Sequence, residues 1–468
     1  MALLIEDGGM IVEFNSEAYI NEYIERGRKA QAEYEQFDQE QVDKVVQAVG
    51  RVVFQNAEEL AELAVEETGM GVYEDKVAKN RSKASIIWND LKDKKSVGII
   101  DRDEKTGITK VAKPMGIVAA ITPTTNPIVT PMSNIMFALK GRNAIIITPH
   151  HRSKGCSTRT VEYINEAIGK LGAPENLVQI LEVHSRENTK NLISSCDVTV
   201  ATGGMGMVKA AYSSGKPALG VGAGNVQCII DDDAVIKKVV PMIIAGRTFD
   251  NGIICSGEQS IIVNEDRFDE VVTVLKENKT LVVTDREDVL KVRNSIFDKE
   301  GHMNKHLVGQ SVFSVGEFAK LDIPQDTRMI AVLADGAGKN DILAKEKMCP
   351  VIALFKTKDF EDSVETARLN LEEEGKGHSV CIHSHNRKNI EYAGDKLSVS
   401  RFVLNQSCAS SAGGSFYNGL NPTNTLGCGS WGNNSISENL TYYHLINVSR
   451  IAEYMPDNHV PDEKELWG

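Results

Sequence analysis

Cys255 is the residue of this 468-residue chain best suited to nucleophilic chemistry. It lies in "DNGIICSGEQ" (250–259), where Gly252 and Gly257 permit a sharp backbone path. A thiolate there can attack a carbonyl carbon, and the Cys255 backbone N–H can help to stabilise the resulting oxyanion. Free cysteine is also among the residue types most often buried, so on this stretch alone a core cysteine is the better interpretation.

Asn126 is a candidate for a second oxyanion donor. It lies in "ITPTTNPIVTP" (121–131), bracketed by Pro123 and Pro127 at the carboxyl end of an expected strand. Ligand sites of open α/β sheets gather at such ends, and a fixed amide N–H₂ group can donate to developing negative charge. An Asn that closes an Asx-type turn explains the same stretch, and without further context that interpretation is favoured.

A glycine-rich turn follows another expected strand. In "VATGGMGMVKAAYSSGKP" (200–217) the strand ends at Thr202, three glycines follow within four residues, and a helix begins near Met207. Glycines let backbone N–H groups approach a ligand, and a helix N-terminus favours anionic or electron-rich groups. The spacing is not GxGxxG and no acid follows at the usual distance, so an ordinary tight turn explains it equally well.

The apolar pattern predicts the elements that position these residues. Compact apolar runs without alternation are typical of strands buried on both faces, and longer segments between them suit crossover helices, such as 153–171. Strand, helix and strand in sequence indicate a doubly wound parallel sheet. The four runs are 116–122, 143–148, 177–182 and 197–202.

The residues before and after this region complete the predicted organisation. The first hundred residues are expected to be helical, because valines recur at steps of three and four over 42–53. A second α/β alternation follows Cys255, with strands near 260–265, 350–355, 378–384 and 401–406 and helices from about 267 and across 360–373. A hairpin is expected over 97–113. We therefore predict a dinucleotide-binding domain over 1–240, with its hairpin in a bridging element, a catalytic domain over 241–430 and a C-terminal bridging segment over 431–468.

Composition excludes several classes of protein. The net charge of −13 argues against nucleic-acid binding. The chain lacks an 18-residue uncharged apolar window, and acids near its start do not suit a secretory signal, so neither membrane insertion nor export is expected. The eight cysteines form no CxxC pair and the ten histidines do not fall at ligand spacings near them. This favours reduced thiols in the cytoplasm and no metal site.

Taken together, the order and spacing of Asn126, the glycines at 203–206, Cys255 and "KEKMCPV" (345–351) resemble the aldehyde dehydrogenase superfamily, and five stretches resemble its CoA-acylating branch. The resemblance runs from about residue 15 to the C-terminus and is nearest to acylating succinate-semialdehyde dehydrogenases and to the aldehyde dehydrogenase half of bifunctional alcohol/aldehyde enzymes. It implies two doubly wound parallel-sheet domains with a small bridging element. The stretches are "MGVYEDKVAKN", "AYSSGKP", "FDNGIICSGEQS", "KEKMCPV" and "LGCGSWGNNSISENLTYYHLINVSRI".

The resemblance also implies roles for individual residues. Cys255 would be the nucleophile and Asn126 the oxyanion donor, while His378, in "GKGHS", matches a histidine near the active site of this branch. A surface histidine at the start of a strand is the alternative for His378. The nicotinamide would lie on Gly203 and Gly204, with its ribose on Glu346. The full set expected to bind cofactor is Thr122, Pro123, Thr124, His150, Arg152, Thr202, Gly203, Gly204, Gly222 and Glu346.

A missing carboxylate favours CoA over water as the acyl acceptor. Hydrolytic aldehyde dehydrogenases carry a water-activating glutamate in a Gly-rich segment before the cysteine, but here that segment reads "PALGVGAGNVQ" (217–227). A thiol acceptor is partly ionised and strongly nucleophilic, so it needs less help from a base. Separately, "ITPHHRSK" (147–154) places basic residues at a helix start, where they could bind phosphates of NADP or CoA or form a solvated helix entrance. The choice between NAD and NADP stays open.

These features predict an NAD(P)-dependent enzyme that converts succinate semialdehyde and CoA to succinyl-CoA, and the reverse. The alternative substrate is acetaldehyde or another short aldehyde such as sulfoacetaldehyde. A hydrolytic dehydrogenase and a catalytically silent dinucleotide-binding scaffold are the other candidates, and the missing glutamate and the joint presence of Cys255, Asn126 and Glu346 disfavour them. The hairpin and the apolar tail, which bridge subunits in the superfamily, predict a homodimer or homotetramer.

Overall fold

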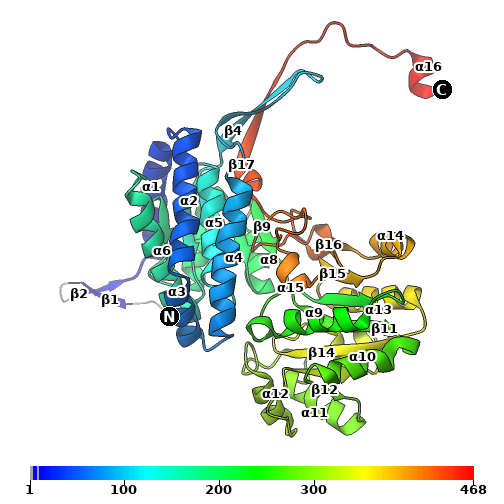
Figure 1. The fold of residues 1–468 in the computed structure, drawn as a ribbon. Coiled ribbons are helices and arrows are strands. Elements are labelled where there is room, and N and C mark those ends of the chain that lie inside the picture. The colour runs from blue at the N-terminus through cyan, green and yellow to red at the C-terminus, as the bar shows by residue number, and fades with distance from the viewer. Residues whose placement is uncertain (1–3, 8–9) are drawn as a thin grey trace.

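Two parallel sheets form the body of the protein in the computed structural model, which describes residues 4–7 and 10–468 (Figure 1). The first sheet has five strands in the order β7-β6-β5-β8-β9, and all of its pairs are parallel. Every residue of β5 and β6 is buried, as the unalternated apolar runs predicted. The strands are β5 (Ile117–Ile121), β6 (Ala144–Thr148), β7 (Val178–Ile180), β8 (Val198–Thr202) and β9 (Ala218–Val221).

Eight helices accompany the first sheet. In α2 a capping box at Asp38 fixes the N-terminus, and a stripe of buried valines packs the helix against α4, α5 and α6. The helical start predicted for the chain is confirmed from α1 to α4, whereas residues 4–7 and 10–13, which were also expected to be helical, form strands. The helices are α1 (Ser16–Tyr34), α2 (Gln39–Gln55), α3 (Ala57–Thr68), α4 (Tyr73–Leu91), α5 (Val129–Lys140), α6 (Lys154–Gly169), α7 (Arg186–Ser195) and α8 (Met205–Tyr212).

The second sheet has seven parallel strands in the order β12-β13-β14-β11-β10-β15-β16. The chain passes from the first sheet to the second between Val221 and Val226, because the next strand, β10, pairs with β11 and β15. The boundary between the domains was predicted later in the sequence, at residue 240. The strands are β10 (Val226–Ile230), β11 (Glu258–Asn264), β12 (Thr280–Val283), β13 (Met329–Leu333), β14 (Val351–Thr357), β15 (Gly377–His383) and β16 (Val399–Leu404).

The helices that accompany the second sheet lie between its strands in sequence, except for α15, which follows the last strand, and they complete the doubly wound pattern. They are α9 (Ile236–Thr248), α10 (Glu265–Glu277), α11 (Arg286–Ile296), α12 (Val312–Ala319), α13 (Phe360–Glu373), α14 (Arg387–Lys396) and α15 (Cys408–Ser411). Short 3₁₀ turns occur at η1 (His151–Ser153), η2 (Phe249–Gly252), η3 (Gly338–Asn340), η4 (Ile342–Ala344), η5 (Ser430–Gly432) and η6 (Tyr442–Leu445).

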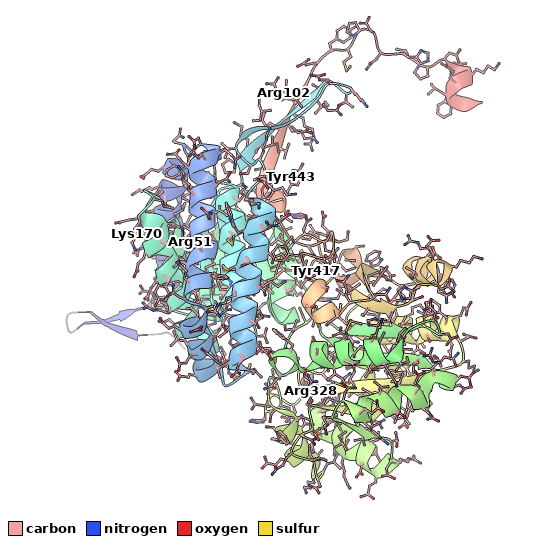
Figure 2. All side chains as sticks on the ribbon, in the orientation of Figure 1. Arg51, Arg102, Lys170, Arg328, Tyr417 and Tyr443 are labelled. Carbon is pink, nitrogen blue, oxygen red and sulfur yellow. The ribbon has the colours of Figure 1, made fainter. Side chains whose placement is uncertain are left out.

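A three-stranded antiparallel sheet projects from this body as an arm (Figure 1). It consists of β3 (Gly98–Asp103), β4 (Ile108–Pro114) and β17 (Ile446–Ala452), so the hairpin predicted over 97–113 is present and the C-terminal segment pairs with it. Arg102 lies on this arm and Tyr443 at its base (Figure 2). The tail beyond β17 ends in α16 (Glu463–Trp467).

Two further observations complete the fold. Near the start of the chain, β1 (Leu4–Asp7) pairs with β2 (Met10–Glu13). Among the helices that the structure describes, none has both the length and the apolar run that crossing a bilayer requires.

Candidate active site

One cavity of about 430 Å³ brings together almost all of the residues predicted to be functional. Its walls come from the carboxyl ends of β5, β6 and β8 in the first sheet and from the loops around β11 and β14 in the second. Ligand sites of doubly wound sheets form at this edge. Of the predicted residues, it is lined by Cys255, Asn126, Thr122, Pro123, Thr124, His150, Arg152, Thr202, Gly203, Gly204, Gly222 and Glu346.

The loop before the nucleophile has an unusual backbone that other elements hold in place. Asp250 and Asn251 both adopt left-handed conformations, with φ of 53° and 52°. Consecutive non-glycine residues in this region are strained and persist only when their surroundings fix them. The Asp250 carboxylate accepts from the Val72 backbone N–H at 2.9 Å, the Asp250 N–H donates to Asp75 at 2.7 Å, and Asn251 donates to the Gly309 carbonyl at 3.0 Å.

A buried guanidinium fixes the other side of the same loop. Arg247, at the end of α9, donates to the carbonyl oxygens of Gly252 and Lys347, both at 2.6 Å, and to that of Glu258 at 3.2 Å. The Gly252 carbonyl precedes the nucleophile in the sequence, the Glu258 carbonyl follows it, and the Lys347 carbonyl belongs to the residue next to Glu346. One side chain thereby sets the position of Cys255 relative to Glu346.

The Cys255 thiol is neutral at physiological pH in this environment. Burial raises its pKa to about 12, and the charges of Glu346 and Cys428 act in the same direction, while Arg401 opposes them. Cys255 is half-buried and faces the cavity, whereas the other seven cysteines are buried. Cys255 is therefore the thiol that a ligand in the cavity reaches.

The segment that lacks a carboxylate packs tightly against the nucleophile. A Cβ atom added at Gly224 would lie 1.9 Å from the Cys255 carbonyl oxygen, so only glycine fits there. Gly222, Ala223 and Gly224 line the cavity beside Cys255. Among the described residues of the cavity wall, Glu346 carries the single carboxylate.

Asn126 is presented by the loop between β5 and α5. Its side-chain oxygen accepts a hydrogen bond of 2.8 Å from the ammonium of Lys79, on α4. Lys79 in turn binds Asp250, in the nucleophile loop, at 2.5 Å. The two loops predicted to carry the nucleophile and the oxyanion donor are thus connected through one lysine.

The glycine turn after β8 leaves space for a flat ligand. A Cβ atom built at Gly203 or Gly204 meets nothing within 4 Å, so their backbone faces open cavity. Glu346, which lines the same cavity from the loop before β14, has its pKa raised to about 8, chiefly by burial and then by the charge of Glu374, which accepts from the Glu346 backbone N–H at 2.7 Å. This pairing of bare glycine backbone and a carboxyl group fits a nicotinamide and its ribose.

The far end of the cavity is basic. His150 and Arg152 reach it from the start of α6, as predicted, and the structure adds His184 and Arg186. Burial and the neighbouring positive groups lower the pKa of His150 to about 4. An anionic group such as a ribose phosphate would find positive charge and no lining carboxylate among the described residues of this end.

His378 does not line the cavity. It lies in β15, is fully buried, and neither ring nitrogen has a hydrogen-bond partner among the residues that the structure describes. Burial and the charge of Arg401 lower its pKa to about 3, so the imidazole is neutral. Arg401 also influences the pKa of Cys255, which places its guanidinium near both residues. The active-site role of His378 stays a prediction.

Several lining or supporting residues were not identified from the sequence. Lys76, Lys79 and Lys83 occupy successive turns of one face of α4, and Asp250 meets the first two. Their spacing of three and four residues was readable in "DKVAKNRSK", but basic residues at that spacing usually form a solvated face. Only the tertiary fold shows that this face is turned inward.

Comparison with known proteins agrees with this geometry. The model of the aldehyde dehydrogenase family matches residues 10–438. The chain is 53% identical over 454 residues to a succinate-semialdehyde dehydrogenase (acetylating) from Clostridium kluyveri, covering 97% of this chain and 100% of the relative. It is 39% identical to a sulfoacetaldehyde dehydrogenase from Acholeplasma sp, over 95% of this chain and 93% of that protein.

Solved structures give the same result. An acetylating aldehyde dehydrogenase from Geobacillus thermoglucosidasius superposes with a TM-score of 0.91 at 37% identity, covering 96% of this chain and 98% of the other. A propionaldehyde dehydrogenase from Rhodopseudomonas palustris, solved with bound CoA and an acylated cysteine, has a TM-score of 0.82 at 26% identity, covering 93% and 97%. The chain belongs to the aldehyde dehydrogenase family. The predicted fold class, the resemblance to the acylating branch and the enzyme class are confirmed.

The reactivity of Cys255 tests the electrostatics of the site. Because ionised Glu346 disfavours the thiolate, Glu346→Gln lowers the Cys255 pKa only above the Glu346 pKa of about 8. Alkylation by iodoacetamide in the absence of cofactor is expected to accelerate with pH up to at least pH 10, and the variant to match the wild type below pH 7 and to exceed it above pH 8. Cys255→Ala is the control. A thiol that reacts at a constant rate from pH 6 upward contradicts the raised pKa.

Proposed function

We propose that this chain is a CoA-acylating dehydrogenase of succinate semialdehyde, which it oxidises with NADP or NAD and CoA to succinyl-CoA, and that it also catalyses the reverse reduction. The family, the cavity and the relatives support the acylating chemistry. The observation that favours an acidic aldehyde is Lys83, whose ammonium donates to the carbonyls of Gly413 and Thr423, next to Asn424 of the cavity wall, and forms no ion pair among the described residues.

Cys255 and Asn126 perform the first step. The Cys255 sulfur bonds to the aldehyde carbon, and the oxyanion of this thiohemiacetal accepts hydrogen bonds from the Asn126 amide and the Cys255 backbone N–H. Since the resting thiol is neutral, its proton passes to solvent water as the sulfur attacks. NAD(P) bound on Gly203 and Gly204 would supply the hydride acceptor that oxidation of this adduct to a thioester requires.

Residues of the cavity account for cofactor binding. Gly203 and Gly204 offer open backbone to the nicotinamide, and Glu346 faces them with a carboxyl group suited to ribose hydroxyls. His150 and Arg152 suit the phosphate groups of NADP or of CoA.

The thioester is then transferred to CoA. The CoA thiolate attacks the acyl carbon, the carbon–sulfur bond to Cys255 breaks, and the released Cys255 thiolate regains a proton. Hydrolysis would need a base beside the thioester, and 217–227 carries no carboxylate. The chemistry of the wall therefore favours a thiol acceptor.

Lys83 is suited to the distal carboxylate of the substrate. It lies on α4, and its ammonium donates to the carbonyl oxygens of Gly413 at 3.0 Å and Thr423 at 3.4 Å. Burial lowers its pKa to about 8, with Lys79 adding to the effect. A half-buried cation without a counter-ion gains most from an anionic ligand, because pairing offsets the cost of burying the charge.

CoA dependence tests the acylating mechanism. With succinate semialdehyde and NADP or NAD, steady-state cofactor reduction is expected to require CoA, and Asn126→Ala to lower kcat by about 10²- to 10³-fold, as for other oxyanion donors. Cys255→Ala is expected to abolish turnover. Turnover that continues unchanged without CoA would indicate hydrolysis, and cofactor binding without turnover of any aldehyde would indicate a silent scaffold.

Substitution of Lys83 tests the substrate assignment. Removing one charged hydrogen bond of about 1.5–3 kcal/mol predicts that Lys83→Met lowers kcat/KM for succinate semialdehyde about ten- to hundredfold, while acetaldehyde turnover is little changed. Lys83→Arg keeps the charge and should lose less. Equal losses on both aldehydes would contradict the assignment, and a wild-type preference for sulfoacetaldehyde would select the second candidate, whose sulfonate is also anionic.

The arm and the tail support a proposal about assembly. The tail side chains Tyr454 and Trp467 are 90% and 84% exposed, and the arm contacts little of its own subunit (Figure 1). We propose that they pack against a second copy in a homodimer or homotetramer. Light scattering of the full chain is expected to give a dimer or larger, and removal of 453–468 to shift it toward the monomer. A monodisperse wild-type monomer at micromolar concentration would refute this.

A further inference from the structure

The buried side chains of Lys76, Lys79 and Asp250 form a cluster that connects the nucleophile loop with Asn126. The Lys79 ammonium donates to the Asn126 side-chain oxygen at 2.8 Å and to Asp250 Oδ2 at 2.5 Å. The same Asp250 oxygen accepts from Lys76 at 3.0 Å. Lys76, Lys79 and Asp250 are almost completely buried.

The chemistry of the ammonium group determines how the Asn126 amide is oriented. An ammonium only donates hydrogen bonds, so the atom of Asn126 that contacts it must be the oxygen. The N–H₂ group is then on the opposite side of the planar amide. The flipped amide would place two buried donors against each other, which carries the cost of unsatisfied polar groups. Because Asn126 lines the cavity, its N–H₂ group is available to a ligand there.

The charges around Lys79 strengthen the same donor. Two ammonium groups share the single Asp250 carboxylate, so the cluster carries one net positive charge when all three groups are ionised. The charges of both lysines lower the Asp250 pKa against the effect of burial. A charged donor on the amide oxygen polarises the amide and makes its N–H bonds better donors.

The cluster also fixes a distance across the site. Asp250 belongs to the strained turn before Cys255, while Asn126 belongs to the loop after β5 in the first sheet. Lys79, from α4, touches both. Neither loop has to rely on its own stiffness to keep the nucleophile and the oxyanion donor at a working separation.

We propose that Lys79 is a positioning residue of the oxyanion site, which holds the Asn126 amide with its N–H₂ group toward the aldehyde oxygen and ties Asn126 to the nucleophile loop through Asp250. This inference rests on the proposed role of Asn126. Lys79 acts through Asn126 and need not touch the substrate.

Lys76 offers a matched control, because it binds the same carboxylate oxygen as Lys79 but forms no hydrogen bond with Asn126 among the described contacts. The rate of the first turnover, measured as NAD(P)H formed without CoA at saturating aldehyde, reports thioester formation. Lys79→Met is expected to lower this rate about ten- to hundredfold, a part of the loss that follows removal of an oxyanion donor. Lys76→Met should change it less than about threefold, although both variants lower the melting temperature. Cofactor affinity should be little changed in both.

Combination with Asn126→Ala separates positioning from general damage. If Lys79 acts through Asn126, Lys79→Met adds less than about threefold to the loss in the Asn126→Ala background. Multiplicative losses, or equal losses in Lys79→Met and Lys76→Met, would overturn the inference while leaving the function intact. A normal first-turnover rate in Asn126→Ala would overturn the role of Asn126 and this inference together. If Lys79→Met does not fold, Lys79→Arg, which keeps a charged donor, must retain a rate within about tenfold of wild type, and a larger loss overturns the inference.

Discussion

The buried ion pair between Lys79 and Asp250 is the interaction on which the rest of the site depends. A carboxylate without solvent persists only when paired, and loss of one partner of such a pair costs about 3–5 kcal/mol in typical proteins. Here the pairing joins α4 to the turn that carries Cys255, and Lys79 extends it to Asn126. The cluster thereby holds together groups from two sheets that share no strand.

The remaining features of the site follow from burial. The Cys255 thiol has a high pKa, the pKa of Glu346 is about 8, and Lys83 is a cation without a counter-ion among the residues that the structure describes. A ligand that brings opposite charge into the cavity therefore shifts the pKa of each of these groups toward its charged form. The missing carboxylate in 217–227 matters in the same setting, because this segment packs beside Cys255 and offers no carboxylate that could activate a water molecule against the thioester.

The sequence predicted the sheets well, because strands buried on both faces leave compact apolar runs such as 143–148, which becomes β6. It also predicted the cavity wall around Cys255, Asn126 and Glu346, where specific stretches resemble a known family. Lys79 and Lys83 were out of reach, since a helix face of lysines looks solvated until the fold turns it inward. The place where the first sheet gives way to the second was also hidden, because β10 resembles the preceding strands in composition.

The most direct test of the central claim is acyl transfer to Cys255 in the absence of any nicotinamide cofactor. The full-length protein is incubated with succinyl-CoA, and its peptides are analysed by mass spectrometry. We expect one succinyl group on the peptide that carries Cys255 and release of CoA in equal amount. Addition of excess labelled CoA should then remove the succinyl group from Cys255 and form labelled succinyl-CoA. A succinyl group on another residue, or no adduct at all, would contradict it.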